Sequence, residues 1–118
     1  MKWRRRLNSN VRQLQLVTMG KYKVLLRGQN FLLEMDGEAQ KLGFYTTRFV
    51  EGNDRCTAEQ KAISSLRDDP ELRDIVRNES SDAPMLFVEQ IDEIDSFAGL
   101  HLPGTGFSFY RDGEVKKP

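Results

Sequence analysis

Residues 43–51 read Gly43-Phe44-Tyr45-Thr46-Thr47-Arg48-Phe49-Val50-Glu51, and this stretch decides the fold. The run concentrates aromatic and β-branched side chains, which pack well on a pleated sheet, so it predicts a strand from about residue 42 to 51. A helix start follows, because Thr57 and a glutamine three residues later match the spacing of a capping box. We therefore interpret the stretch as the central strand of a small α+β domain, leading into its main helix.

Two further strand patterns precede this run. Residues 21–27 alternate in polarity and residues 31–35 are apolar, and both patterns favour strands. Gly28-Gln29-Asn30 favours a turn between them, which predicts an antiparallel meander of three strands. The alternative is that residues 28–30 form a bulge within one long strand. Asp36-Gly37 predicts a tight turn, because glycine accepts the positive φ that such a turn needs.

Helices and one or two more strands are expected after residue 51. Apolar residues at helical spacing mark the first helix after Thr57, and Asp69-Pro70 starts a second one that ends near Asn78. Strands are expected over residues 85–91 and 107–110. Helices packed on one face of an antiparallel sheet leave the other face to solvent or to a partner. The order predicts a homodimer that forms through this face or through a sheet edge.

Length and composition indicate one domain. The chain has 118 residues, enough for a single core, and the predicted domain spans residues 19–113. Residues 1–18 are interpreted as a disordered or artefactual leader ahead of a natural start at Met19, and residues 114–118 as a frayed tail. Cys56 is the single cysteine, which excludes an intrachain disulfide and favours a reducing compartment. No stretch resembles a secretory signal or approaches the ~20 apolar residues of a membrane span. We therefore expect a cytoplasmic protein with no membrane partner.

The net charge of zero hides an asymmetry between the leader and the body. Residues 1–19 hold five basic and no acidic residues, whereas the remainder holds 13 basic and 18 acidic residues. An acidic body repels phosphate backbones, which argues against nucleic-acid binding by the folded part. The alternative is a nucleic-acid-associated protein that uses Arg4, Arg5 and Arg6 of the leader as a basic arm.

Few residues offer catalytic or metal chemistry. His101 is the single histidine, and no Cys/His cluster with the spacing of a zinc site exists. The acidic residues near the predicted strand at 85–91 lack the order of a calcium-binding loop. We expect no cofactor, no metal and no catalytic residue, and we interpret Cys56 as a small buried residue or an inert thiol.

Arg48 is the best candidate for a ligand-binding side chain. Alternation along the strand places it on one face with Thr46, and places Tyr45 and Thr47 on the other. An arginine flanked by threonine hydroxyls could hold a carboxylate or a phosphate, because its guanidinium offers paired donors. The alternative is a structural arginine that extends its guanidinium to solvent or pairs with an acid on a neighbouring strand, such as Glu34 or Glu89.

Two resemblances to known families accompany these patterns. The run at 43–51, together with Asp-Pro-Glu-Leu-Arg at 69–73 and Pro103-Gly104-Thr105-Gly106-Phe107, resembles a small family of bacterial proteins of unknown function. That resemblance implies no activity. The Tyr22-Lys23-Val24 start of a β-meander followed by the Thr57 helix is similar to HicB-type antitoxins, which implies an antitoxin-like role.

The sequence therefore predicts a small cytoplasmic binding or regulatory module. We expect it to act through its sheet face or edge, with itself as a homodimer or with another protein as partner. The alternatives are the antitoxin-like or nucleic-acid-associated protein and a small enzyme or anionic-ligand binder built on Arg48.

Overall fold

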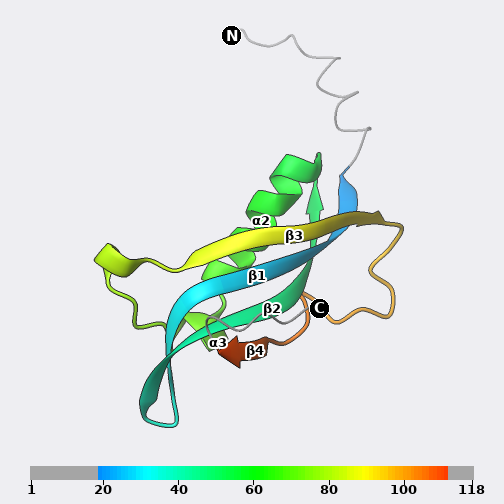
Figure 1. The fold of residues 1–118 in the computed structure, drawn as a ribbon. Helices are drawn as coiled ribbons and strands as arrows, with labels where there is room; N and C mark the ends of the chain where they lie inside the picture. Colours follow the sequence, from blue (N-terminus) through cyan, green and yellow to red (C-terminus); the bar gives the residue numbers. More distant parts are fainter. Residues whose placement is uncertain (1–18, 112–118) are drawn as a thin grey trace, which may run out of the picture.

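A computed structural model describes residues 19–111, which form a four-stranded antiparallel sheet with helices on one face (Figure 1). The strands are β1 (Gly20–Met35), β2 (Glu38–Gly52), β3 (Met85–Ile94) and β4 (Ser108–Arg111), in the spatial order β3-β1-β2-β4. Between β2 and β3 lie the helices α2 (Arg55–Arg67) and α3 (Pro70–Arg73) and a 3-10 turn, Ser80–Asp82. The predicted α+β class with an antiparallel sheet is confirmed.

The predicted meander of three strands before the helix is wrong, because residues 20–35 form one strand. Gly28 pairs with Phe44 and Phe31 pairs with Leu42, so Gln29 and Asn30 together oppose a single residue of β2. This is the bulge that the sequence left open as the alternative, and Asn30 has a φ of 62° there. The extra residue shifts the alternation by one position, which keeps Phe31 on the face that Gly28 occupies.

A tight turn joins β1 to β2, as Asp36-Gly37 predicts. Met35 pairs with Glu38, so the loop between them consists of Asp36 and Gly37. Both loop residues have a positive φ, 53° for Asp36 and 82° for Gly37. Such a turn matches the right-handed twist of the two strands.

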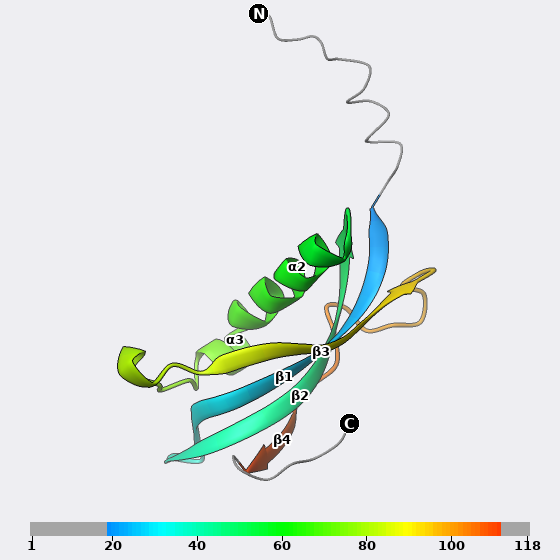
Figure 2. The same ribbon diagram turned by 45° about the horizontal axis from the view of Figure 1, so that its top comes forward.

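The core lies between α2 and one face of the sheet (Figure 2). Alternate residues of β1 and β2, among them Val24, Leu26 and Phe44, are fully buried against the small side chains Ala58 and Ala62 of α2. Because alanine side chains are small, α2 can approach the sheet closely, which favours a tightly packed core. None of the helices formed by residues 19–111 packs on the opposite face of the sheet.

The start of α2 and the end of α3 differ from the prediction. Asp54, not Thr57, caps α2, because its carboxylate accepts a hydrogen bond from the Thr57 backbone N–H at 2.8 Å. Helix α3 starts at Pro70 as predicted but ends at Arg73, well before Asn78. The chain after it is extended because it pairs with β1, where the Glu34 N–H donates to the Ile75 carbonyl at 2.9 Å. This tertiary pairing outweighs the local helical pattern.

Candidate functional site

Arg48 is buried in the structure, on the helix-covered face of the sheet. Its residue is 2% exposed, and its guanidinium donates to the Asp69 carboxylate at 2.9 Å. Asp69 also caps α3 by accepting from the Glu71 N–H at 2.9 Å. The guanidinium carbon lies 5.6 Å from the centre of the Phe107 ring. The arginine thus joins β2, α3 and the segment before β4.

The predicted acidic partners of Arg48 are both engaged elsewhere. Glu34 pairs with Arg77 and Glu89 pairs with Arg27, each at 2.9 Å. The pairing with Asp69 across 21 positions could not be seen in the strand alone. The alternative in which Arg48 extends its guanidinium to solvent is wrong, because its side chain is 3% exposed. The hypothesis that Arg48 holds a ligand stays a prediction. Burial and the ion pair of Nη2 with Asp69 favour a structural role, while the Nε has no hydrogen-bond partner among residues 19–111.

The other three candidate residues do not gather around Arg48. Thr46 shares its face, and its hydroxyl donates to the Thr105 carbonyl at 3.2 Å. Tyr45 and Thr47 lie on the opposite face, as alternation predicts. The Tyr45 ring lies 5.6 Å from that of Tyr110, and partial burial, followed by the charge of Tyr110, raises the pKa of Tyr45 above its ordinary value.

The segment before β4 covers the edge of β2 next to Arg48. The Phe49 N–H donates to the Pro103 carbonyl at 2.8 Å, and the Thr105 N–H donates to the Thr47 carbonyl at 2.9 Å. Gly104 lies between these bonds, and a Cβ there would fall 2.1 Å from the Thr47 oxygen. The glycine therefore serves close backbone packing at this edge.

The uncovered face of the sheet is the first candidate interaction surface. We call it the open face, and the strand registers place on it Lys23, Leu25 and Arg27 of β1, Tyr45, Thr47 and Phe49 of β2, and Phe87, Gln90 and Asp92 of β3. The guanidinium carbon of Arg27 lies 4.4 Å from the centre of the Phe87 ring on this face. The hydrogen bond to Glu89 raises the pKa of Arg27 above its ordinary value.

A shallow hollow of about 160 Å³ lies on this face around Leu25, bordered by Lys23, Thr47, Gln90 and Asp92. Its lining holds one apolar, two neutral polar and two oppositely charged side chains. The open face around it carries Arg27, Tyr45, Phe49 and Phe87, and aromatic residues and arginine are enriched in protein–protein interfaces.

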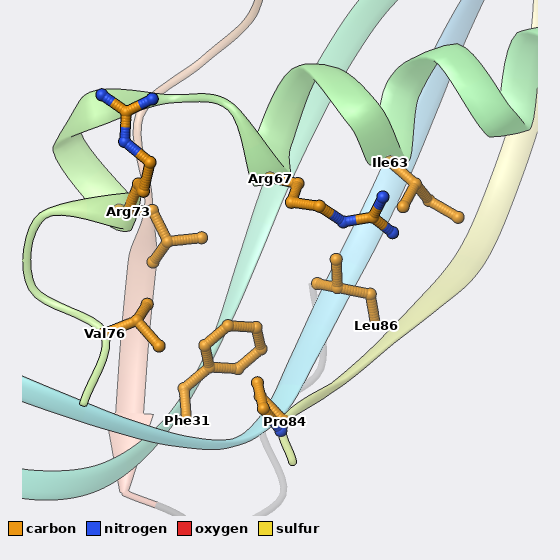
Figure 3. Close-up of a pocket in the computed structure, with 8 residues that line it drawn as sticks. Phe31, Ile63, Arg67, Arg73, Val76, Pro84 and Leu86 are labelled. Atoms are coloured by element: carbon orange, nitrogen blue, oxygen red, sulfur yellow. The ribbon is translucent and has the colours of Figure 1, made fainter. Parts of the chain in front are cut away.

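A cleft of about 550 Å³ on the helix side of the sheet is the second candidate site (Figure 3). Its lining comes from α2, α3, the segment after α3, β1 and the start of β3, and consists of Phe31, Ile63, Arg67, Leu72, Arg73, Val76, Pro84 and Leu86. Sequence reasoning missed this cleft, because its residues are scattered over 55 positions and meet only in the fold.

Three further expectations concern Cys56, metal binding and the basic arm. Cys56 is exposed in the first turn of α2, so the interpretation of it as a small buried residue is wrong. Across residues 19–111, no group of three or more His, Cys, Asp or Glu side chains is arranged to hold a metal ion. Arg4, Arg5 and Arg6 lie outside the described residues, so the basic arm stays a prediction.

Comparisons with known proteins leave the family open. No family model, no curated protein and no solved structure matched the chain. In the described part of the chain, no helix is both long enough and apolar enough to cross a membrane. The resemblances found in the sequence therefore stay expectations.

Proposed function

We propose that the protein is a small binding module that acts through its open face, and that its partner is a second copy of itself. The observation that carries the proposal is the composition of this face, on which Leu25, Tyr45, Phe49 and Phe87 are half-buried and no helix of the described part of the chain packs over them. Burying these groups against a partner removes apolar surface from water, at roughly 25 cal/mol per Å².

The charges on the open face also suit a twofold dimer. Lys23 and Asp92 lie directly across from one another on neighbouring strands. In a twofold dimer whose axis runs from Leu25 between Lys23 and Asp92, each of these two side chains lies near the oppositely charged one of the other copy, which would favour one orientation of the two faces. Lys23 lies across from Asp92 and Arg27 pairs with Glu89, so these groups leave no excess of positive charge, which disfavours a nucleic-acid partner. A reducing, cytoplasmic setting agrees with the exposed thiol of Cys56.

The test is sedimentation of the full chain over a wide concentration range. We expect a dimer at high concentration, which dissociates when Leu25→Glu places a charge at the centre of the face. Gln60→Glu adds the same charge to the exposed side of α2 and serves as the matched control. A monomer at every concentration contradicts the proposal. A dimer that Leu25→Glu leaves unchanged contradicts the role of the open face and points to the free edge of β3.

A further inference from the structure

We infer that the cleft beside α2 and α3 binds a small molecule with an apolar body and a single carboxylate. The site is independent of the proposed dimer, because the cleft lies on the helix side of the sheet and the open face lies on the other. Its volume of about 550 Å³ falls within the range of roughly 300–1,000 Å³ that small-molecule sites occupy.

The walls of the cleft select an apolar body. Six of its eight lining residues are apolar, and the two deepest, Phe31 and Leu72, are at most 4% exposed. Ile63, Val76 and Leu86 pack against the core with one side and face the cleft with the other. A ligand that fills this space removes the apolar side chains of the lining from water. The gain in binding free energy is proportional to the apolar area that the ligand covers.

The cleft is held open by backbone pairing beneath it. The Arg77 N–H donates to the Leu32 carbonyl at 2.8 Å, and Leu33 forms a β-bridge with Val76. The Asn78 side chain accepts from the Leu32 N–H at 2.8 Å and donates to the Asn30 carbonyl at 2.9 Å. These bonds fix the segment that carries Val76 beside β1, so this wall of the cleft is part of the folded sheet. A site that exists before the ligand arrives avoids the cost of ordering its walls.

Arg67 supplies the recognition of the anionic group. Figure 3 shows its side chain lying across the mouth, with the guanidinium above Leu86 and beside Ile63. Among residues 19–111, Arg67 takes part in no ion pair, so its donors are available to a ligand. A guanidinium binds the two oxygens of a carboxylate with paired hydrogen bonds.

Arg73 has a different role from Arg67. Its guanidinium points away from the interior of the cleft in Figure 3 and lies 3.7 Å from the Asp74 carboxylate. It therefore adds positive charge at the rim, whereas Arg67 makes the direct contact with the carboxylate. The cleft thus suits a ligand with one carboxylate and one apolar body.

The experiment uses decanoate as the probe, below its micellar concentration, with the full chain labelled for amide NMR. We expect saturable shifts of amides along the cleft, from α2, α3 and the start of β3, while amides of the open face stay in place. Decan-1-ol, which has the same chain without the charge, should bind at least several-fold more weakly. No saturable shifts with decanoate, or shifts confined to the open face, would overturn the inference.

Variants separate the head group from the body of the ligand. Arg67→Gln should weaken decanoate binding by roughly 3- to 10-fold, the range for a partly exposed charged contact, and should leave decan-1-ol binding unchanged. Lys61→Gln, on the same helix and outside the cleft lining, removes the same charge and should change neither. Ile63→Trp fills the cleft and should abolish both, provided that its amide spectrum stays dispersed; if it does not fold, the Arg67→Gln pair of titrations decides. Equal binding of decanoate to the wild type and to Arg67→Gln would refute the assignment of the head group.

Discussion

Removing the carboxylate of Asp69 is the sharpest test of the role that the structure gives to Arg48. The Arg48 side chain is 3% exposed, whereas the Asp69 side chain is 18% exposed. Asp69→Ala leaves a buried guanidinium without a counter-charge, so we expect the free energy of unfolding to fall by about 3–5 kcal/mol. The loss of the cap on α3 adds about 1 kcal/mol, and Asp69→Asn, which keeps a capping oxygen, separates the two effects.

The reverse deletion should cost much less. Arg48→Met leaves a carboxylate that lies closer to the surface and keeps its bond to the Glu71 N–H, and the methionine fills much of the vacated volume. We expect a loss of about 1–2 kcal/mol. The double variant should lose less than the sum of the single changes, because removing both partners leaves no unpaired charge, and the coupling should be about 1–3 kcal/mol.

The assay is urea unfolding followed by far-ultraviolet circular dichroism, with equal m-values as the check that the unfolding transition is comparable. Arg77→Met is the matched control, since it breaks an arginine–carboxylate pair of the same length whose side chains are both 45% exposed. That change should cost less than about 1 kcal/mol. If Asp69→Ala costs no more than Arg77→Met, or if the two single costs simply add, the structural reading of Arg48 is refuted and the ligand-binding hypothesis gains ground.

Two further predictions concern local structure. Gly43→Ala should lower stability by about 1–3 kcal/mol, because the new Cβ would lie 2.4 Å from the Tyr110 ring; in thermal unfolding Gly106→Ala, with nothing within 4 Å, should behave like the wild type. The hydrogen bond from the Thr57 backbone holds the pKa of Asp54 below its ordinary value of 3.8, so its stabilising effect is present above that pH and is lost as the pH falls through the folded pKa. Asp54→Asn keeps a cap and should therefore flatten the fall in unfolding midpoint below pH 4, while an unchanged profile would contradict this account.

Alternation along single strands was the part of the fold that the sequence predicted well. It placed Thr46 and Arg48 on one face and Tyr45 and Thr47 on the other, and it located the Asp36-Gly37 turn. Both follow from local sterics, since side chains alternate in a strand and glycine tolerates positive φ. The face of the sheet on which a residue lies could therefore be predicted without knowing which strands lie beside it.

Features that depend on contacts between residues far apart in the sequence could not be predicted. The pairing of Arg48 with Asp69 and the end of α3 at Arg73 both result from contacts between segments far apart in the chain. The bulge at Asn30 was only one of two readings, because a glycine-containing break suits a turn and a bulge equally until the pairing with β2 is known. The cleft escaped for the same reason, since no local pattern marks a space between elements.

The place of β4 in the sheet has a consequence for how fast the chain folds. Tyr110 donates a hydrogen bond to the Gly28 carbonyl across 82 positions, and Phe107 and Phe109 close over Phe44 at ring distances of 5.2 and 6.0 Å. Only the β1–β2 hairpin joins neighbouring segments, and hairpins form within about 1–10 μs. Every other strand pairing must wait for the closure of a long loop, which carries an entropic cost before any contact rewards it. We expect refolding on the scale of milliseconds to seconds, the time range of folds dominated by non-local pairing, with the hairpin as the early structure onto which the last strand docks.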